Sequence, residues 1–145
     1  MKNLASNNRA KYDFQIIETI DAGLVLNGSE VKSVKAGHVS LNGSYILIHP
    51  KGAKLINTHI SPYQYGTVDN YQPTRIRSLL LTKTQINSLL SKDKGLSIIP
   101  LGLFEVSRGL IKLRIGLARG RKKQDKRDYL KKREAQKEIR SSSTI

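Results

Sequence analysis

The side chains with the most evident chemistry in this sequence are the cations of its last 27 residues, Arg119 to Ile145. This segment holds 11 Lys or Arg against four Asp or Glu, a net charge of +7, and residues 1–118 carry the other +8. Ammonium and guanidinium groups at this density neutralise phosphates and release their counterions. Because the segment has little apolar area to bury, we interpret it as a basic arm attached to a folded, RNA-binding body.

The composition of the whole chain supports a polyanionic partner. Its 145 residues fit one domain with a real hydrophobic core, and the net charge of +15 gives a pI near 10.2. A membrane surface is the competing partner, but no segment has an apolar face opposite a basic one, and no run approaches the roughly 18 apolar residues that span a bilayer. The polar N-terminus and the absence of Cys predict a cytoplasmic protein without thiolate chemistry.

Residue types that catalyse reactions or bind metals are present but not grouped. His38, His49 and His59 are widely spaced, so we interpret them as ordinary loop or strand-end residues. The sequence has no glycine-rich phosphate loop, and nothing pairs the seven carboxylates of residues 1–118. We therefore expect no enzymatic activity, no metal and no cofactor. A metal-dependent nuclease assembled from scattered acids stays open as the alternative of a different class.

Cations are also spread over the predicted body. Each alone is the ordinary charge of a solvated surface, but their excess predicts a face that follows a folded RNA backbone. These cations are Arg9, Lys11, Lys32, Lys35, Arg75, Arg77, Lys83, Lys112 and Arg114.

Two further sets of side chains each allow two interpretations. The tyrosines Tyr63, Tyr65 and Tyr71 can stack on bases, or equally seal one end of a barrel. The acids Asp21 and Glu30 are unexpected in a phosphate-binding body. A carboxylate can accept hydrogen bonds from base amino or 2′-hydroxyl groups, or orient a nearby Arg. Glu30 can instead support the first turn of its helix.

The elements that must position these side chains are mostly short strands. Apolar, β-branched segments cover residues 12–20, 23–26, 44–49, 53–59, 96–104 and 110–118, and the second continues the strand signal of the first after Asp21 and Ala22. The last segment alternates, so Ile111, Leu113, Ile115 and Leu117 face the core and Lys112 and Arg114 face outward. Residues 1–9 are polar and are predicted to be loose.

Two short helices are predicted between the strands. Ser29 is the expected N-cap of the first and Gly37 its stop. Thr82 and Gln85 form a capping-box pattern for the second, whose apolar stripe is Ile86, Leu89 and Leu90. About six strands and two or three short helices favour a small, closed or partly closed antiparallel barrel with a helix packed at an opening.

The basic arm has some helical character. Asp128 and Lys132 form a favourable i,i+4 pair, but Tyr129, Leu130 and Ile139 bury too little area to hold an isolated helix. We expect disorder in the free protein and folding on a polyanionic surface.

Several segments in order resemble one family, the small protein B or SsrA-binding proteins of bacterial trans-translation. The resemblance runs from about Asn8 to Arg140. Its segments are Asn8-Arg-Ala-Lys11, Asp21-Ala-Gly-Leu-Val-Leu26, Gly28-Ser-Glu-Val-Lys-Ser-Val-Lys-Ala-Gly37, His59-Ile-Ser-Pro-Tyr63, Pro73-Thr-Arg-Ile-Arg-Ser-Leu-Leu-Leu81 and Gly116-Leu-Ala-Arg-Gly-Arg-Lys-Lys-Gln-Asp-Lys-Arg127.

The resemblance implies an OB-like barrel over residues 1–118 and a ribosome-binding tail over residues 119–145. It implies a monomeric, non-enzymatic adaptor that binds the tRNA-like domain of transfer-messenger RNA and delivers it to stalled 70S ribosomes. Elongation factor Tu with GTP would be an indirect partner through that RNA. The tail would probe the decoding centre and the empty message channel, and fold there. A ribosomal or general structured-RNA-binding OB protein is the alternative of the same class.

Site residues follow from the resemblance position by position, together with the cations described above. For the tRNA-like domain they are Asn8, Arg9, Lys11, Asp21, Glu30, Lys32, Arg75, Arg77, Leu80, Thr82 and Lys83. For the ribosome-binding tail they are Arg119, Arg121, Lys122, Lys123, Gln124, Asp125, Lys126, Arg127, Lys131, Lys132 and Arg133.

The sequence departs from the family pattern at four of the matched positions. Asp21 stands where Glu is usual, which keeps the charge and shortens the reach. Thr82 replaces Asn or His, which favours a helix-cap role for it. Ser78 replaces a basic residue and removes one cation. Gln124 stands where some relatives have a ring, so an amide replaces base stacking there.

Overall fold

The computed structural model describes residues 2–66 and 69–143, and for residues 123–125 and 137–143 it describes the backbone alone. Nine strands and four helices make up this described part. In chain order they are β1 (Lys2–Ser6), α1 (Asn8–Asp13), β2 (Phe14–Leu24), α2 (Gly28–Lys35), β3 (Val39–Ser40), β4 (Tyr45–His49), β5 (Gly52–Ile56), β6 (His59–Ile60), β7 (Arg77–Leu80), α3 (Lys83–Leu90), β8 (Ser97–Ser107), β9 (Leu110–Gly120) and α4 (Lys123–Ser143).

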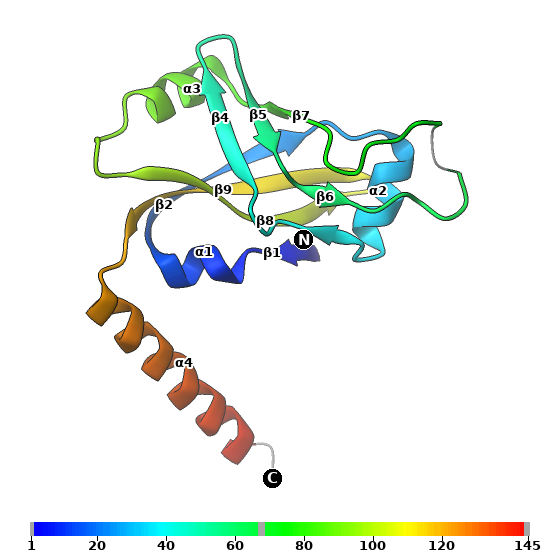
Figure 1. The fold of residues 1–145 in the computed structure, drawn as a ribbon. Coiled ribbons are helices and arrows are strands. Elements are labelled where there is room, and N and C mark those ends of the chain that lie inside the picture. Colours follow the sequence, from blue (N-terminus) through cyan, green and yellow to red (C-terminus); the bar gives the residue numbers. More distant parts are fainter. Residues whose placement is uncertain (1, 67–68, 144–145) are drawn as a thin grey trace.

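Seven strands form one antiparallel sheet in the order β1-β8-β9-β2-β7-β5-β4, and β3 and β6 form a separate pair. The sheet curls, so that β4 at one edge contacts β8, and Figure 1 shows the β4–β5 hairpin standing across β8 and β9. The prediction of a mainly β, antiparallel barrel with short helices is confirmed. Its assignment to the OB class stays a prediction.

The hydrophobic core lies inside this curl. Ile111, Leu113 and Ile115 of β9 are at most 2% exposed, and Leu55 and Leu103 from β5 and β8 are fully buried beside them. Burial of one such side chain contributes about 1.5–3 kcal/mol. The predicted alternation is therefore confirmed from Leu110 to Ile115, where Lys112 and Arg114 lie on the outward side, but it ends there, because Gly116 and Ala118 are buried as well as Leu117.

Residues 2–9 are not loose as predicted, because they form β1 and the start of α1, and Met1 lies outside the described residues. Asn7 joins these two elements and is 8% exposed. Its Nδ2 donates to the Pro100 carbonyl at 2.8 Å, and its Oδ1 accepts from the Ala10 amide at 3.2 Å as the helix N-cap. An edge strand that pairs on one side needs few apolar residues, so its polar composition did not reveal it.

The first predicted helix is present as α2, but its cap lies earlier than expected. Asn27 Oδ1 accepts from the Glu30 amide at 2.8 Å, and Glu30 Oε1 accepts from the Asn27 amide at 3.0 Å, a reciprocal capping box. Ser29 is therefore not the cap, and its hydroxyl donates to the Gly66 carbonyl at 2.6 Å. Gly37, with φ of 85°, follows the helix end as predicted.

The second predicted helix is present as α3 with the expected cap. Thr82 Oγ1 accepts from the Gln85 amide at 3.1 Å, and Gln85 Oε1 accepts from the Thr82 amide at 2.9 Å. Ile86 and Leu89 are buried, but Leu90 is 45% exposed. The prediction for Leu90 is wrong because the helix packs by a narrow face, against β4.

The predicted number of strands is too low. The segments on either side of Asp21 form one continuous strand, β2, and the sequence did not reveal β1, β3, β6 or β7. Two of these have only two residues. In β7 the buried side of the strand carries Arg77, which is fully enclosed. Because a charged residue stands where an apolar one is expected, the sequence of β7 lacks the hydropathy pattern of a half-buried strand.

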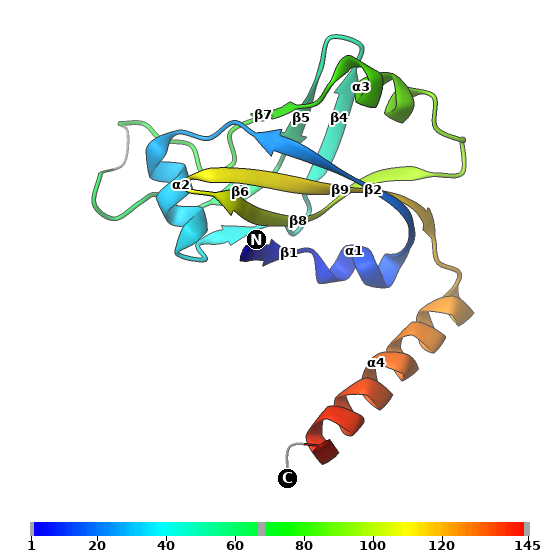
Figure 2. The ribbon, with the colours of Figure 1, turned by 180° about the vertical axis from the view of Figure 1, so that it is seen from behind.

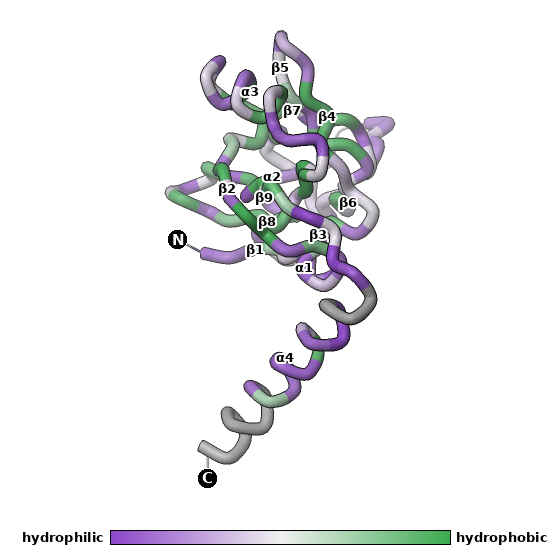
Figure 3. The backbone as a smooth tube through the Cα atoms, turned by 90° about the vertical axis from the view of Figure 1, so that its left-hand side faces the viewer, coloured by the Kyte–Doolittle hydropathy of each residue, from purple (hydrophilic) through white to green (hydrophobic). Residues whose placement is uncertain are grey.

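The basic arm is helical in the structure. It leaves the barrel beside α1 as α4 and points away from the sheet (Figure 1). Most residues of its coloured middle part, residues 126–136, are hydrophilic (Figure 3). The expectation that this segment is disordered in the free protein concerns the chain in solution and stays a prediction. Residues 144–145, the end of the predicted tail, lie outside the described residues.

Candidate nucleic-acid interface

The outward face of the central strands brings several predicted residues together. Cross-strand pairing places Asp21 of β2 beside Arg114 of β9, then Gly102 of β8 and Ser6 of β1. Directly paired residues of antiparallel strands point to the same side of a sheet. These four positions therefore form one row across four strands, which Figure 2 shows with β2 and β9 side by side and β1 below them.

A second row runs parallel to the first on the same side. Leu80 of β7 pairs with Gly23, which pairs with Lys112, then Phe104 and Asn3. Leu80 is 64% exposed, and it lies against Gly23, where an added Cβ would be 3.2 Å from the Leu80 Cβ. We call the outward positions of these two rows the β2–β9 face. It combines predicted RNA-binding positions from separate segments, Asp21 and Leu80, with the cations of β9.

Arg114 is the best-positioned cation of the β2–β9 face. Its Nε donates to Asp21 Oδ1 at 3.1 Å, and its guanidinium lies over the Phe104 ring, 4.8 Å from the ring centre. Both partners of the ion pair are 39% exposed. Arg114 was among the cations noted from the sequence but not among the predicted site residues. Its outward position on an alternating strand was the signal available for it.

Of the predicted residues of α1, Lys11 lines a pocket together with Arg114 of this face, whereas Arg9 lines a different pocket with Asn42 and Ser44. Asn8 and Lys11 are exposed. Arg9 is also exposed, pairs with Asp13 at 3.2 Å and lies 5.3 Å from the Tyr12 ring centre. The sequence did not single out Asn7, although its side chain holds α1 to β8. An Asn directly before a short helix was the signal for it.

Three other predicted residues form an internal ionic cluster instead of an RNA-binding surface. Glu30 is 1% exposed and Arg77 is fully buried. Arg77 donates to Glu30 Oε2 at 2.6 and 2.9 Å, and Arg75 donates to the same carboxylate, with Nε at 3.0 Å from Oε2. The assignment of Glu30 and Arg77 to RNA contact is corrected, because their charged atoms are enclosed and bonded to each other. Arg75 keeps a side chain that is 35% exposed.

The cluster also fixes the backbone around it. Arg77 donates to the carbonyls of Thr58 at 2.6 Å and Pro73 at 2.9 Å. Burial alone would raise the pKa of the Glu30 carboxyl, but hydrogen bonds from Arg75, from the Asn27 amide and from Arg77 lower this pKa from 4.5 to about 2. Glu30 is thus ionised under ordinary conditions, and it joins α2 to the segment before β7.

The three tyrosines divide between the two roles considered for them. Tyr71 belongs to the ionic cluster, since its hydroxyl donates to the Ile60 carbonyl at 2.9 Å and lies 3.1 Å from Glu30 Oε2. Tyr63 and Tyr65 meet edge to face at 5.9 Å. Tyr65 is 77% exposed, and the Lys32 ammonium lies 5.3 Å from the centre of the Tyr63 ring. Tyr71 is therefore half-buried with its hydroxyl in the ionic cluster, whereas the Tyr65 ring is open to solvent.

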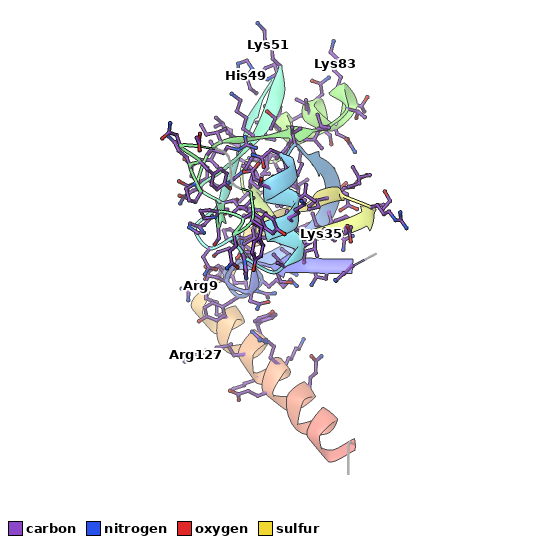
Figure 4. The ribbon with its side chains drawn as sticks, turned by 90° about the vertical axis from the view of Figure 1, so that its right-hand side faces the viewer. Arg9, Lys35, His49, Lys51, Lys83 and Arg127 are labelled. Atoms are coloured by element: carbon purple, nitrogen blue, oxygen red, sulfur yellow. The ribbon has the colours of Figure 1, made fainter. Side chains whose placement is uncertain are left out.

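The remaining predicted body residues lie at the opposite end of the molecule from α1. Thr82 caps α3, and Lys83 is exposed on its first turn. Figure 4 shows Lys83 at the same end as His49 and Lys51, with Arg9 at the other. The structure therefore does not bring Lys83 together with Arg9 and Lys11. A single RNA contact would have to extend along the molecule to reach all three.

The start of the tail is held against α1 and β2. Arg121 Nε donates to the Phe14 carbonyl at 3.1 Å, and its guanidinium lies 4.6 Å from the Tyr129 ring centre. Lys126 Nζ lies 3.5 Å from Asp13 Oδ1. The predicted tail residues Arg119, Lys122, Arg127, Lys131 and Lys132 are exposed and Arg133 is half-buried. For Lys123, Gln124 and Asp125 the structure describes the backbone alone.

Two further classes of site are absent from the described part of the chain. Among residues 2–66, 69–122 and 126–136, whose side chains the structure describes, no group of three or more His, Cys, Asp or Glu has a geometry that could bind a metal ion. No helix in the described part of the chain is long and apolar enough to cross a membrane.

Comparison with known proteins places this geometry in a family. The family model described as SmpB protein matches residues 4–144. An SsrA-binding protein of Chlorobaculum tepidum is 46% identical over 136 residues, which is 92% of this chain and 87% of the relative. An SsrA-binding protein of Enterococcus faecalis is 43% identical over 140 residues, 95% of this chain and 90% of the relative.

A solved structure is similar in fold as well as in sequence. It is described as "tmRNA-SmpB: a journey to the center of the bacterial ribosome", and it matches with a TM-score of 0.67 and 38% identity. The match covers 88% of this chain and 94% of that chain.

Proposed function

The chain belongs to the SmpB protein family, and from that premise we propose that it is an RNA-binding adaptor of trans-translation. It binds the tRNA-like domain of transfer-messenger RNA and brings this RNA to stalled ribosomes. The observation that carries the proposal is the match to SsrA-binding proteins over nearly the whole chain, together with the likeness to a chain from a tmRNA–SmpB structure.

The barrel, residues 1–118, holds the RNA in this proposal. The β2–β9 face supports this role, because it combines Asp21 and Leu80 with the cations Lys112 and Arg114. A face with cations on one strand and apolar groups beside them suits a folded RNA, which proteins recognise through backbone and shape. Asn8 and Lys11 extend the same contact along α1.

The tail, residues 119–145, acts on the ribosome in this proposal. Its exposed cations supply affinity for ribosomal RNA, and the decoding centre and the empty message channel give it a surface on which to fold. The activity takes place in the cytoplasm, where ribosomes translate, and the protein works as a monomer. Elongation factor Tu with GTP takes part indirectly, through the RNA. The adaptor performs no catalytic step itself.

Direct binding tests the RNA specificity. The probe is a labelled tRNA-like domain of transfer-messenger RNA, and the control is a hairpin RNA of equal length and charge. Since non-specific binding depends on charge alone, we expect tighter binding to the tRNA-like probe at every salt concentration. Equal binding to both RNAs would instead support a general structured-RNA-binding protein. Cleavage of either RNA that depends on Mg²⁺ and follows the protein would support the nuclease alternative.

A further inference from the structure

A pocket of about 240 Å³ opens on the β2–β9 face between β1, α1 and Arg114. Gly102 forms part of its floor. A Cβ at this position would lie 2.8 Å from the Ala5 carbonyl oxygen, so the close approach of β1 to β8 requires glycine there. The residues that matter for its chemistry are Asn3, Ser6, Lys11, Phe104 and Arg114.

Two cations converge on this pocket, from different elements. Arg114 comes from β9 and Lys11 from α1, and no carboxylate is among the described residues that line the pocket. The hydrogen bond between Arg114 and Asp21 uses Nε, and a guanidinium has further N–H donors in a rigid, planar fork. Those donors suit the oxygens of a phosphate, which Arg binds in a bidentate manner.

The polar side chains of β1 add a neutral donor. Asn3 Nδ2 donates to Ser6 Oγ at 3.1 Å, which leaves the Ser6 O–H available as a donor. A hydroxyl donor beside two cations is a common arrangement at nucleic-acid phosphates. The pocket therefore offers donors and positive charge, and it suits an anion.

Asp21 and Phe104 fix the guanidinium that faces the pocket. Asp21 holds Nε at 3.1 Å, and the Phe104 ring supports the plane of the guanidinium at 4.8 Å. Phe104 is 5% exposed, so it acts as a rigid platform. The rotamer of Arg114 is thereby set before any ligand arrives, which reduces the conformational entropy lost on binding.

We propose that this pocket binds a backbone phosphate of the RNA, with Arg114 and Lys11 as ligands, and that Asp21 is a positioning residue that acts through Arg114. The inference rests on the proposed function, since the phosphate belongs to the RNA assigned there. The positioning role explains why a carboxylate lies on a surface that binds a polyanion, where a negative charge alone would weaken binding.

The substitution Asp21→Asn tests the positioning role, because the two explanations predict opposite changes in the Kd for the tRNA-like probe. Removing a negative charge raises the net charge by one, so electrostatic attraction alone predicts tighter binding of the tRNA-like probe. The positioning role predicts the opposite, a Kd higher by about threefold to tenfold, because Arg114 loses its anchor. In an Arg114→Gln background Asp21→Asn should no longer weaken binding. Tighter binding from Asp21→Asn alone would overturn the positioning role.

The salt dependence tests the phosphate contact. Each phosphate neutralised contributes roughly one unit to the slope of log Kd against log salt concentration. Arg114→Gln and Lys11→Gln should each lower this slope by about one and weaken binding about fivefold near 0.15 M salt. Arg114→Lys should keep the slope. The matched control is Lys51→Gln, which removes one exposed charge at the opposite end of the molecule (Figure 4) and should leave the slope nearly unchanged.

Two outcomes would contradict the pocket, and neither is the same as failure of the proposed function. If Arg114→Gln weakens binding but leaves the slope intact, the guanidinium stacks on a base instead. If the wild-type chain prefers the tRNA-like probe and no pocket variant changes the slope, the RNA passes elsewhere. Only a wild-type chain without that preference refutes the proposed function. Thermal unfolding of each variant excludes misfolding. We expect each Tm to lie within a few degrees of the wild-type Tm, because the side chains of Arg114 and Lys11 are at least partly exposed.

Discussion

At the scale of single residues, two arginines of this protein lie in opposite environments. Arg77 and Arg114 are both arginines near predicted strands, yet one is enclosed with Glu30 and the other lies open on the β2–β9 face. Alternation on β9 was visible in the sequence and correctly predicted that Arg114 faces outward. Nothing local marks Arg77 as buried, because its acid partner lies 47 residues earlier in the chain. Burial of a charge depends on a partner that only the fold supplies.

The ionic cluster makes a prediction about stability and pH. The pKa of Glu30 is lowered on folding from 4.5 to about 2. A lowered acid pKa stabilises the folded state above the unfolded pKa, and this contribution is lost as the pH falls from about 4.5 towards 2. A shift of this size corresponds to about 3 kcal/mol. We expect Glu30→Gln to lower the free energy of unfolding by about that amount at pH 7.

The measurement is chemical denaturation of both proteins from pH 7 to pH 2. The difference in unfolding free energy between wild type and Glu30→Gln should shrink as the pH falls below 4.5, because wild type loses the ionised carboxylate that the variant never had. Glu18→Gln, at an exposed carboxylate, is the matched control and should differ little from wild type throughout. A difference that stays constant with pH would show that the charge of Glu30 is not what stabilises the fold.

At the scale of elements, prediction succeeded where the sequence carries a local signal. The capping box of α3, the β4–β5 hairpin and the alternation of β9 each depend on a few neighbouring residues. β1 and β7 were missed, because an edge strand and a strand with a buried Arg lack the expected hydropathy pattern. The β2–β9 face was not predictable either, since it depends on cross-strand register over four strands.

The cap of α3 gives a prediction at this scale. Thr82 accepts from the Gln85 amide, and loss of an N-cap oxygen costs about 1 kcal/mol. We therefore expect Thr82→Ala to lower the free energy of unfolding by about that amount and Thr82→Ser to preserve it. Thr84→Ala, at an exposed position in the first turn of the same helix, is the control and should be neutral or slightly stabilising. If Thr82→Ala leaves stability intact and weakens RNA binding, Thr82 contacts RNA and is not mainly a cap.

The tail helix gives a second prediction at this scale. Its described contacts with the barrel lie near its start, at Lys126 and Tyr129, and exposed ion pairs contribute about 0–1 kcal/mol each. A polar helix held so weakly opens readily. We expect backbone amides of the tail to exchange with solvent at near random-coil rates in the free protein and to become protected on the ribosome. Strong protection in the free protein would contradict folding on binding.

At the scale of the whole molecule, the positive charge divides between the barrel and the basic arm, to which we assign different tasks. The sequence showed this division clearly, because the basic run follows the last strand of the barrel. Figure 1 shows the consequence in space, with α4 extending from the barrel beside α1. The barrel can thus hold one RNA while the tail reaches another. What the sequence could not show is the direction of that exit, which Arg121 fixes through the Phe14 carbonyl.

Deletion of Lys122 to Ile145 tests this division most directly, with two readouts on the same protein: Kd for the tRNA-like RNA and peptide tagging on ribosomes stalled on messages without a stop codon. The variant keeps Arg121 and the complete barrel. We expect Kd to change less than about fivefold near 0.15 M salt, the loss coming from non-specific charge, and tagging to be abolished. The double charge reversal Lys126→Glu with Arg127→Glu should separate the two readouts in the same way. Collapse of RNA affinity, or tagging that survives the deletion, would contradict the account.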